Sequence, residues 1–532
     1  MDLDRTLLER RVTRLLLPWK NKAGPGVTLG IVQNGHLVLH RSAGLASVEQ
    51  DVPIGPETRF RIASVSKQFT CAAVLMLDQE GRLRLDDPVT RHLTDLPEQG
   101  VTVEHLMHNT SGIRDMLEIL RQGGADLGTP VSTEALTDGI RRQRRLNFAP
   151  GTRFLYSNSN FLLLGLIVER LTGETLAAFL ERRIFAPLGM SATQHTPDVS
   201  VAIPGLATGY LPHPAGWMRA PHALPLGGEG GLVSSVTDLA LWDRNLNTGR
   251  VGGDWLAPAL ARQTPFLNGT ENRYARGQIV RDYRGHGTIS HGGLWPGFKT
   301  EFLRVPVLDT TVIAIANAGN ADPGLLAQQV LDVLLEAVPG TEPLVPVPPP
   351  AVLASLAGRY LDRDTGATLD IGINAGGQPT LATNGLVVTA TPLPDNLLAS
   401  PRSSSVFAVQ AQGTDAVEVE QDAGHRSVWH RVKPGATLPD GLAGTYRSDE
   451  MAARWTVGIS HGIAVVDVQG PVVAGGPWTV EPVEDDVFRV LVPGTLFQAW
   501  LDVRVLRDDA GITGLDVSGA RARHVRYLRD PA

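Results

Sequence analysis

Ser64 and Lys67 are the first residues in this sequence whose types and spacing could carry out nucleophilic catalysis. They lie near the start of residues 61–81, a stretch that is apolar on nearly every side and ends at Gly81. This pattern predicts a buried helix of about four turns. A serine at the start of that helix would face unpaired backbone N–H groups and the positive end of the helix dipole, which suits a developing oxyanion. A buried lysine three residues later needs polar partners or loses its proton, and a neutral lysine beside a serine is a general base. The same pattern also fits an N-cap serine followed by a lysine that reaches solvent.

Two further segments supply groups that a serine and a lysine lack. Tyr156-Ser157-Asn158 precedes an apolar helix predicted at 161–171. The Tyr156 phenol can accept or donate a proton, and the Asn158 amide can orient the lysine and the substrate. The alternative is a turn tyrosine followed by a capping asparagine. Ser290-His291-Gly292-Gly293 ends a predicted strand, where two glycines would let another backbone approach, as an extended substrate at a strand edge requires. The alternative for His291 is a buried structural histidine.

The elements that position these residues alternate between strands and helices. Residues 27–33 and 36–40 flank Asn34-Gly35, a dipeptide typical of a tight hairpin turn. A mostly helical region extends to about residue 225, and strand patterns return at 284–291, 298–305 and 310–317 before an amphipathic helix at 325–337. The predicted fold class is α+β, with one antiparallel sheet completed by distant segments and helices on its faces.

The composition changes after residue 337. Residues 338–350 are proline-rich and predict an extended linker. Beyond them the helical patterns end, and Leu356-Ala357-Gly358-Arg359-Tyr360 recurs 86 residues later as Leu442-Ala443-Gly444-Thr445-Tyr446. We therefore predict a catalytic domain at 1–337 and two small antiparallel β-barrel domains at 351–434 and 435–532.

Composition narrows the partners and the compartment. A formal charge of -7 argues against nucleic acid or an anionic membrane surface as a partner. Cys71 is the only cysteine, so an intramolecular disulfide is impossible, and the charged N-terminus does not resemble a signal peptide. These features favour a cytoplasmic protein. We expect it to use neither a metal nor another cofactor. Self-association into a homodimer is left open.

The order Ser-x-x-Lys, Tyr-x-Asn, His-x-Gly resembles the serine β-lactamase-like hydrolases related to class C β-lactamases and D-alanyl-D-alanine carboxypeptidases. The resemblance covers roughly residues 25 to 335, and the other segments that carry it are His108-Asn109-Thr110-Ser111-Gly112-Ile113, Phe148-Ala149-Pro150-Gly151, Pro187-Leu188-Gly189-Met190 and Gly230-Gly231-Leu232. With a histidine-glycine-glycine third motif and two β modules, the chain looks most like bacterial D-aminopeptidases within that family.

The resemblance implies an acyl-enzyme route. Ser64 would attack a carbonyl carbon, Lys67 and Tyr156 would move the proton, and Asn158 would position the side chains. The backbone N–H groups of Ser64 and Leu294 would form the oxyanion hole, with Gly293 beside the substrate.

Substrate selection follows from the same resemblance. His291 stands where β-lactamases carry a lysine that binds a substrate carboxylate, so a neutral histidine favours a substrate with a free amino end. Glu229 is a candidate partner for that ammonium, although a surface acid fits equally well. Residues 469–478 match a loop that enters the cleft in D-aminopeptidases, and Trp478 would supply an apolar wall.

The implied function is removal of an N-terminal D-residue from a short peptide or amide. An esterase or β-lactam hydrolase of the same family is one alternative, because fold does not settle substrate. A non-catalytic penicillin-binding or sensor protein is another.

Overall fold

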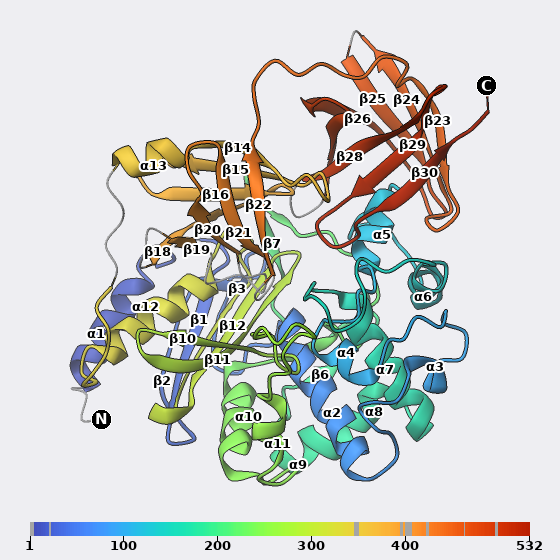
Figure 1. The fold of residues 1–532 in the computed structure, drawn as a ribbon. Coiled ribbons are helices and arrows are strands. Elements are labelled where there is room, and N and C mark those ends of the chain that lie inside the picture. Colours follow the sequence, from blue (N-terminus) through green and yellow to red (C-terminus); the bar gives the residue numbers. More distant parts are fainter. Residues whose placement is uncertain are drawn as a thin grey trace. The chain divides into compact units, whose positions relative to one another are not determined.

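The computed structural model describes residues 5–20, 23–344, 350–393, 397–399, 407–421, 425–461, 463–494 and 498–531 (Figure 1). The chain divides into two compact units. The first contains Met1–Thr94, Gly100–His108 and Asn160–Leu344, and the second contains Asp95–Gln99, Asn109–Ser159 and Val345–Ala532. This division differs from the three domains predicted from the sequence, whose bounds stay a prediction.

The first unit is built on a six-stranded antiparallel sheet. Its strands, in spatial order, are β10 (Ile279–Tyr283), β11 (His286–Trp295), β12 (Phe298–Val305), β13 (Thr310–Ala316), β1 (Val27–Gln33) and β2 (His36–Ala43). β1 pairs with β13 from Val27 opposite Ala316 to Gln33 opposite Thr310. The prediction of one antiparallel sheet completed by distant segments is therefore confirmed.

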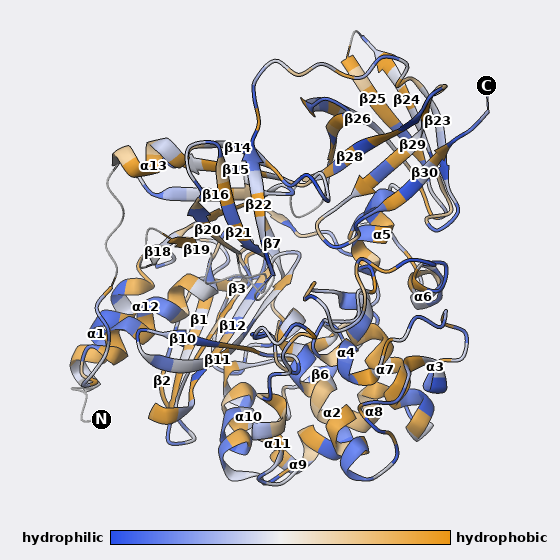
Figure 2. Cartoon of the chain, in the orientation of Figure 1, coloured by the Kyte–Doolittle hydropathy of each residue, from blue (hydrophilic) through white to orange (hydrophobic). Residues whose placement is uncertain are grey.

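Helices cover both faces of this sheet. α1 (Arg5–Leu15) and α12 (Pro323–Leu335) pack against one face through a shared apolar cluster that includes Val12, Leu29 and Val330. Figure 2 shows hydrophobic and hydrophilic residues alternating along α12, as a helix with one buried face requires. α10 (Val236–Thr248) lies on the other face, where Gly30 of β1 faces Val236 too closely for a side chain.

The rest of the first unit is mainly helical. Its central helix α2 (Lys67–Gln79) follows a short 3-10 turn, Ala63–Ser66, and its chain continues to Gly81 in the left-handed conformation that ends a helix (φ 70°). The other helices are α3 (Val89–His92), α4 (Val103–Met107), α7 (Asn158–Thr172, which enters this unit at Asn160), α8 (Leu176–Leu180), the π turn Glu181–Phe185, α9 (Ala186–Leu188) and α11 (Leu256–Leu260). The short strands are β3 (Leu45–Ser47), β4 (Val52–Pro53), β5 (Phe60–Arg61), β6 (Gln194–His195), β7 (Tyr210–His213), β8 (Gly216–Arg219) and β9 (Leu232–Ser234).

The second unit contains helices and two antiparallel β modules. Helices α5 (Met116–Gln122) and α6 (Thr133–Arg141) precede the β modules in the chain. After α13 (Pro350–Leu356), the first module is a nine-stranded sheet of β14 (Gly358–Leu361), β15 (Thr368–Ile373), β16 (Pro379–Thr383), β17 (Leu386–Thr389), β18 (Thr391–Leu393), β19 (Leu397–Ala399), β20 (Phe407–Ala411), β21 (Ala416–Gln421) and β22 (His425–Arg431). The second is a closed barrel of β23 (Gly444–Ser448), β24 (Ala453–Ser460), β25 (Ile463–Gln469), β26 (Ala474–Glu484), β27 (Val487–Val492), β28 (Ala499–Asp508), β29 (Gly511–Ser518) and β30 (Val525–Arg529).

The predicted barrel is confirmed for the second module, whereas the first is a half-barrel. Its terminal strands β17 and β18 are not paired with each other among the described residues. β18 has only three residues, and Pro392 within it has no backbone N–H to donate, which fits a strand at a sheet edge. Part of the predicted linker, residues 345–349, lies outside the described residues, and α13 occupies its end.

The sequence repeat corresponds to a repeated local structure. Tyr360 donates a hydrogen bond to the Leu356 carbonyl (2.9 Å), and Tyr446 donates one to the Leu442 carbonyl (2.6 Å). A C-terminal arginine lies over each ring, Arg431 in the first module and Arg529 in the second. The shared residues therefore tie the first strand of each module to its last.

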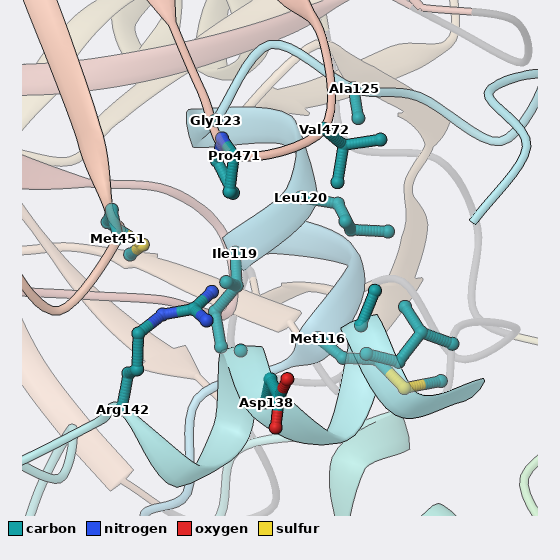
Figure 3. A pocket seen from close by; sticks show the side chains of 13 residues that line it. Met116, Ile119, Leu120, Gly123, Ala125, Asp138, Arg142, Met451, Pro471 and Val472 are labelled. Carbon is teal, nitrogen blue, oxygen red and sulfur yellow. The ribbon is translucent and has the colours of Figure 1, made fainter. Parts of the chain in front are cut away.

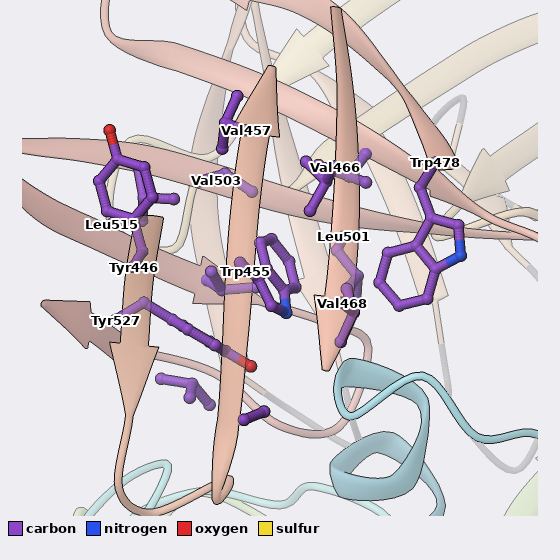
Figure 4. Packing of buried hydrophobic residues seen from close by; sticks show 14 of the residues in the cluster. Tyr446, Trp455, Val457, Val466, Val468, Trp478, Leu501, Val503, Leu515 and Tyr527 are labelled. Atoms are coloured by element: carbon purple, nitrogen blue, oxygen red, sulfur yellow. The ribbon is translucent and has the colours of Figure 1, made fainter. Parts of the chain in front are cut away.

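The closed barrel has its own apolar core (Figure 4). Trp455 lies at its centre, with ring centroids 4.8 Å from Tyr527 and 6.0 Å from Trp478. Its indole N–H donates to the carbonyl of Gln122 at the end of α5, and Ile119 of α5 packs into the same core. Helix α5 is thus part of the barrel's packing.

Among the described residues, we find no helix with the length and apolar character needed to cross a bilayer.

Candidate active site

Ser64 and Lys67 form a hydrogen-bonded pair in the first unit. Ser64 lies in the 3-10 turn before α2 and is partly exposed, whereas Lys67 is the first residue of α2 and is 0% exposed. The Lys67 ammonium nitrogen is 3.0 Å from Ser64 Oγ. The lysine therefore does not reach solvent, and the pair has the contact needed for proton transfer between a nucleophile and its base.

The loop before β9 supports the lysine. Lys67 Nζ donates to the backbone carbonyl of Glu229 (2.7 Å) and lies 5.2 Å from the centre of the Phe161 ring. Because a carbonyl oxygen can only accept, this bond takes one N–H of the lysine in either protonation state and orients the rest of the amine. The Glu229 side chain is buried, and its carboxylate accepts from the Gly227 N–H (2.8 Å) within its own loop.

The backbone at the nucleophile is strained and tightly packed. Ala63, directly before Ser64, has φ 46°, a left-handed conformation that is unfavourable for a residue with a side chain. A Cβ atom on Gly293 of β11 would lie only 2.2 Å from the Ile62 carbonyl oxygen. The backbone that approaches this glycine closely is therefore the chain's own segment before Ser64.

His291 is buried and hydrogen-bonded on both ring nitrogens. Its Nδ1 is 2.6 Å from the Gly292 carbonyl oxygen, which can only accept, so Nδ1 carries the proton. Its Nε2 is 3.0 Å from the Tyr274 hydroxyl, which then donates. Burial, reinforced by the charge of Lys67, lowers the pKa of His291 to about 3. A pKa this low keeps His291 neutral at physiological pH.

Beyond Ser290, β11 is open along one edge. β10 pairs with β11 only from Tyr283 opposite His286 to Ile279 opposite Ser290. In the described part of the chain, residues 291–295 pair with β12 but with no strand on their other side. Leu294 lies in this segment and is 46% exposed. The open edge can accept a segment in extended form.

Tyr156 and Asn158 belong to the second unit, where a polar frame holds them. Tyr156 is 3% exposed, with the Arg521 guanidinium 4.6 Å from its ring centre. Asn158 begins α7, and both its backbone N–H (2.6 Å) and its side-chain amide (2.9 Å) donate to one oxygen of Asp115. Asn109, in a left-handed conformation, accepts from the Ser157 N–H (3.1 Å). The Tyr-x-Asn segment is thus fixed from two sides.

The prediction that Trp478 forms an apolar wall is wrong. The indole is 3% exposed and packs edge to face on Trp455 in the barrel core, because Trp478 is an inward-facing residue of β26 (Figure 4). The predicted projecting loop is shorter than expected, since strand β26 already starts at Ala474. Its glycines serve close packing, as Gly470 and Gly475 lie against the backbone of Gly123 and Gly124 at the end of α5.

The chain matches the family model described as Beta-lactamase over residues 9–335. The chain belongs to the beta-lactamase family.

Curated relatives match nearly the whole chain. A protein named D-aminopeptidase from Brucella anthropi is 29% identical over 95% of both chains. A D-aminopeptidase from Brucella canis is 30% identical over 96% of both chains.

Solved structures show the same fold. The octameric penicillin-binding protein homologue from Pyrococcus abyssi matches 99% of this chain and 100% of its own, with a TM-score of 0.56 and 20% identity. A D-amino acid amidase from Ochrobactrum anthropi, complexed with D-phenylalanine, matches 62% of this chain and 99% of its own, with a TM-score of 0.54 and 23% identity. At these identities the likeness concerns the beta-lactamase fold alone.

Three residues that contact the motif side chains of this beta-lactamase-family site were not predicted from the sequence. Tyr274 contacts His291, Asp115 contacts Asn158, and Phe161 lies beside Lys67. None of these three residues is part of a local sequence pattern. Tyr274 lies 17 residues before its partner His291. Asp115 has the sequence position of an ordinary N-cap, and it also fills that role by accepting from the Leu117 N–H (2.9 Å). The described residues contain no cluster of three or more His, Cys, Asp or Glu side chains suited to a metal ion.

Proposed function

We propose that this protein is a serine hydrolase that removes an N-terminal D-residue from short peptides or amides through an acyl-enzyme on Ser64. The observation that carries the proposal is the 3.0 Å contact between Ser64 Oγ and the fully buried Lys67 amine. A lysine used only for charge or solubility would reach solvent, whereas this one ends at a partly exposed serine hydroxyl.

The chemistry begins at that contact. In its neutral form, Lys67 gives one N–H to the Glu229 carbonyl and turns its lone pair to the Ser64 hydroxyl. As Ser64 Oγ bonds to the substrate carbonyl carbon, its proton passes to the amine. The bond to the leaving nitrogen then breaks, and that nitrogen takes the proton. A water molecule next attacks the ester carbon and passes a proton to the amine, the bond to Ser64 Oγ breaks, and Oγ takes the proton back.

Tyr156 and Asn158 complete this scheme as proposed proton-transfer and positioning residues. Two features support the proposal: the motif order shared with the family, and the position of Phe161. Phe161 contacts Lys67 and follows Tyr156 by five residues, in the helix that Asn158 begins. The backbone N–H groups of Ser64 and Leu294 are the proposed oxyanion hole.

The substrate class rests on three features. The relatives named D-aminopeptidase align over nearly the full length of this chain. The open edge of β11 at residues 291–295 suits a short extended substrate. The neutral His291 provides no charge to attract a substrate carboxylate, which favours a free amino end and disfavours a carboxypeptidase. Glu229 remains the proposed partner for the substrate ammonium.

A substrate panel tests the proposal. D-alanine p-nitroanilide, L-alanine p-nitroanilide, N-acetyl-D-alanine p-nitroanilide, p-nitrophenyl acetate and a chromogenic cephalosporin are compared at matched concentrations. We expect the free D-anilide to give the largest kcat/KM, with acetylation and inversion each reducing it at least tenfold. A preference for the ester or the cephalosporin would instead assign an esterase or β-lactam hydrolase. A stable adduct without turnover would assign a penicillin-binding sensor.

We also propose that the protein self-associates, with a homodimer as the simplest state. The solved relative from Pyrococcus abyssi is described as octameric. Light scattering after size-exclusion chromatography measures the mass directly, and a monomer at micromolar concentration would refute the proposal.

A further inference from the structure

The second unit contains a cavity of about 210 Å³ between α5, α6 and the turn that joins β25 to β26 (Figure 3). Its walls are apolar, formed mainly by buried side chains of Met116, Ile119, Leu120, Leu136 and Met451. An apolar cavity of roughly 150 Å³ holds a benzene molecule in another protein. This cavity therefore has room for a compact ring or a branched alkyl chain.

The turn between β25 and β26 forms one side of the cavity. Pro471 and Val472 line it and are also exposed to solvent, with Val472 39% exposed. Apolar surface that is exposed beside a cavity gives a small molecule a place of entry.

The two charged residues that line the cavity differ in their partners. Asp138 is 2.8 Å from Arg141, which also pairs with Glu134. Arg142, at the end of α6, forms no ion pair in the described part of the chain, and its buried Nε has no hydrogen-bond partner there. Figure 3 shows its side chain extending from α6 toward Ile119. Arg142 is therefore the charged lining residue that lacks a carboxylate partner in the described part of the chain.

Other carboxylates close to the cavity in sequence are already paired with arginine. Glu450, beside Met451, is 2.9 Å from Arg114, and Glu118 of α5 pairs with Arg121. The C-terminal end of α6 compensates part of the Arg142 charge, but a carbonyl dipole at a helix end supplies less than a carboxylate. A guanidinium next to an apolar wall is stabilised most by a carboxylate, which can accept two of its N–H groups.

We propose that this cavity binds a small monocarboxylate with a compact apolar group, the carboxylate on Arg142 and the apolar group among the α5 and α6 side chains. The binding depends on Arg142 and on the empty volume, and it does not depend on chemistry at Ser64.

Calorimetric titration of the full-length Ser64→Ala protein tests the proposal, because that variant cannot turn a probe over. The probes are 4-methylpentanoate, its neutral isostere 4-methylpentanamide, and isopentylamine. We expect the carboxylate to bind, the amide to bind at least tenfold more weakly, and the amine not to bind, since a charge-assisted bond to arginine is lost in each. Equal binding of acid and amide, or no binding of the acid, would overturn the proposal.

Three variants locate the site. Arg142→Gln should weaken the acid at least tenfold and leave the amide unchanged. Arg141→Gln is the control, because Arg141 is the neighbouring arginine with carboxylate partners of its own, and it should retain the acid. Ala135→Leu fills the cavity from a half-buried helical position that tolerates leucine, and it should abolish binding without lowering Tm. Acid binding that survives both Arg142→Gln and Ala135→Leu would place the ligand elsewhere and refute the proposal.

Discussion

Replacing Gly293 with alanine should displace the nucleophile. The added Cβ would lie 2.2 Å from the Ile62 carbonyl oxygen, inside the 3.0 Å that such atoms keep, so the two backbones must separate by about 1 Å. Ile62 and the strained Ala63 lead directly into Ser64, and a misplacement of about 1 Å in a catalytic group costs roughly 100-fold in rate. We therefore expect kcat/KM for D-alanine p-nitroanilide to fall about 100-fold. Overpacking should also cost about 1–3 kcal/mol of stability.

Gly287→Ala provides the control in the same strand. A Cβ atom at Gly287 meets nothing within 4 Å, so this variant should keep wild-type kinetics and Tm. Both variants are compared by steady-state kinetics and by thermal denaturation followed by circular dichroism. If Gly293→Ala stays within threefold of wild type in kcat/KM, the strand yields without moving Ser64, and the close approach is not a catalytic requirement.

Two other predictions follow from buried polar groups. Tyr274→Phe removes the hydroxyl that donates to His291 Nε2, and kcat/KM should fall about 3- to 10-fold, the value of one hydrogen bond. No new transition should appear between pH 5 and 9, because the pKa of His291 is about 3; a transition near pH 6.5 would show that this histidine titrates. Asp502 lies buried in β28 and accepts from the Thr368 hydroxyl (3.2 Å), and burial raises its pKa to about 7. The folded state then keeps a proton that the unfolded state has lost, so stability should fall between about pH 4 and pH 7 by up to about 4 kcal/mol. Asp502→Asn should remove this loss and raise Tm at pH 8 while changing it little at pH 4; parallel Tm curves for the two proteins would contradict the assignment.

The sequence predicted the strands and the paired motifs where local signals were strong. Asn34-Gly35 predicted the hairpin between β1 and β2, and the strand predicted at 298–305 coincides with β12. The repeated leucine and tyrosine predicted two related modules, and the same hydrogen bond recurs in both. Each of these signals lies within a few residues of the structure it determines.

Features that depend on distant contacts were harder to predict. Gly293 suggested a close backbone approach, but only the fold shows that the approaching chain is Ile62. Trp478 sits in a glycine-rich stretch typical of an exposed loop, yet the inward register of β26 places it in the barrel core. Closure of a sheet likewise requires its two end strands to pair with each other. β23 and β30 pair and close the second module, whereas β17 and β18 leave the first module a half-barrel.

The most direct test of the account is intact-protein mass spectrometry during turnover, with wild type, Ser64→Ala and the control Ser191→Ala, an exposed serine in the same unit. Each protein is mixed with D-alanine p-nitroanilide and quenched in acid within milliseconds to seconds. We expect a transient mass increase of one D-alanyl group in wild type and Ser191→Ala, assigned to Ser64 by peptide mapping. In Ser64→Ala we expect no adduct and a turnover rate at least about 1,000-fold lower than that of wild type. An adduct on another residue, or turnover in Ser64→Ala above one tenth of wild type, would contradict the account.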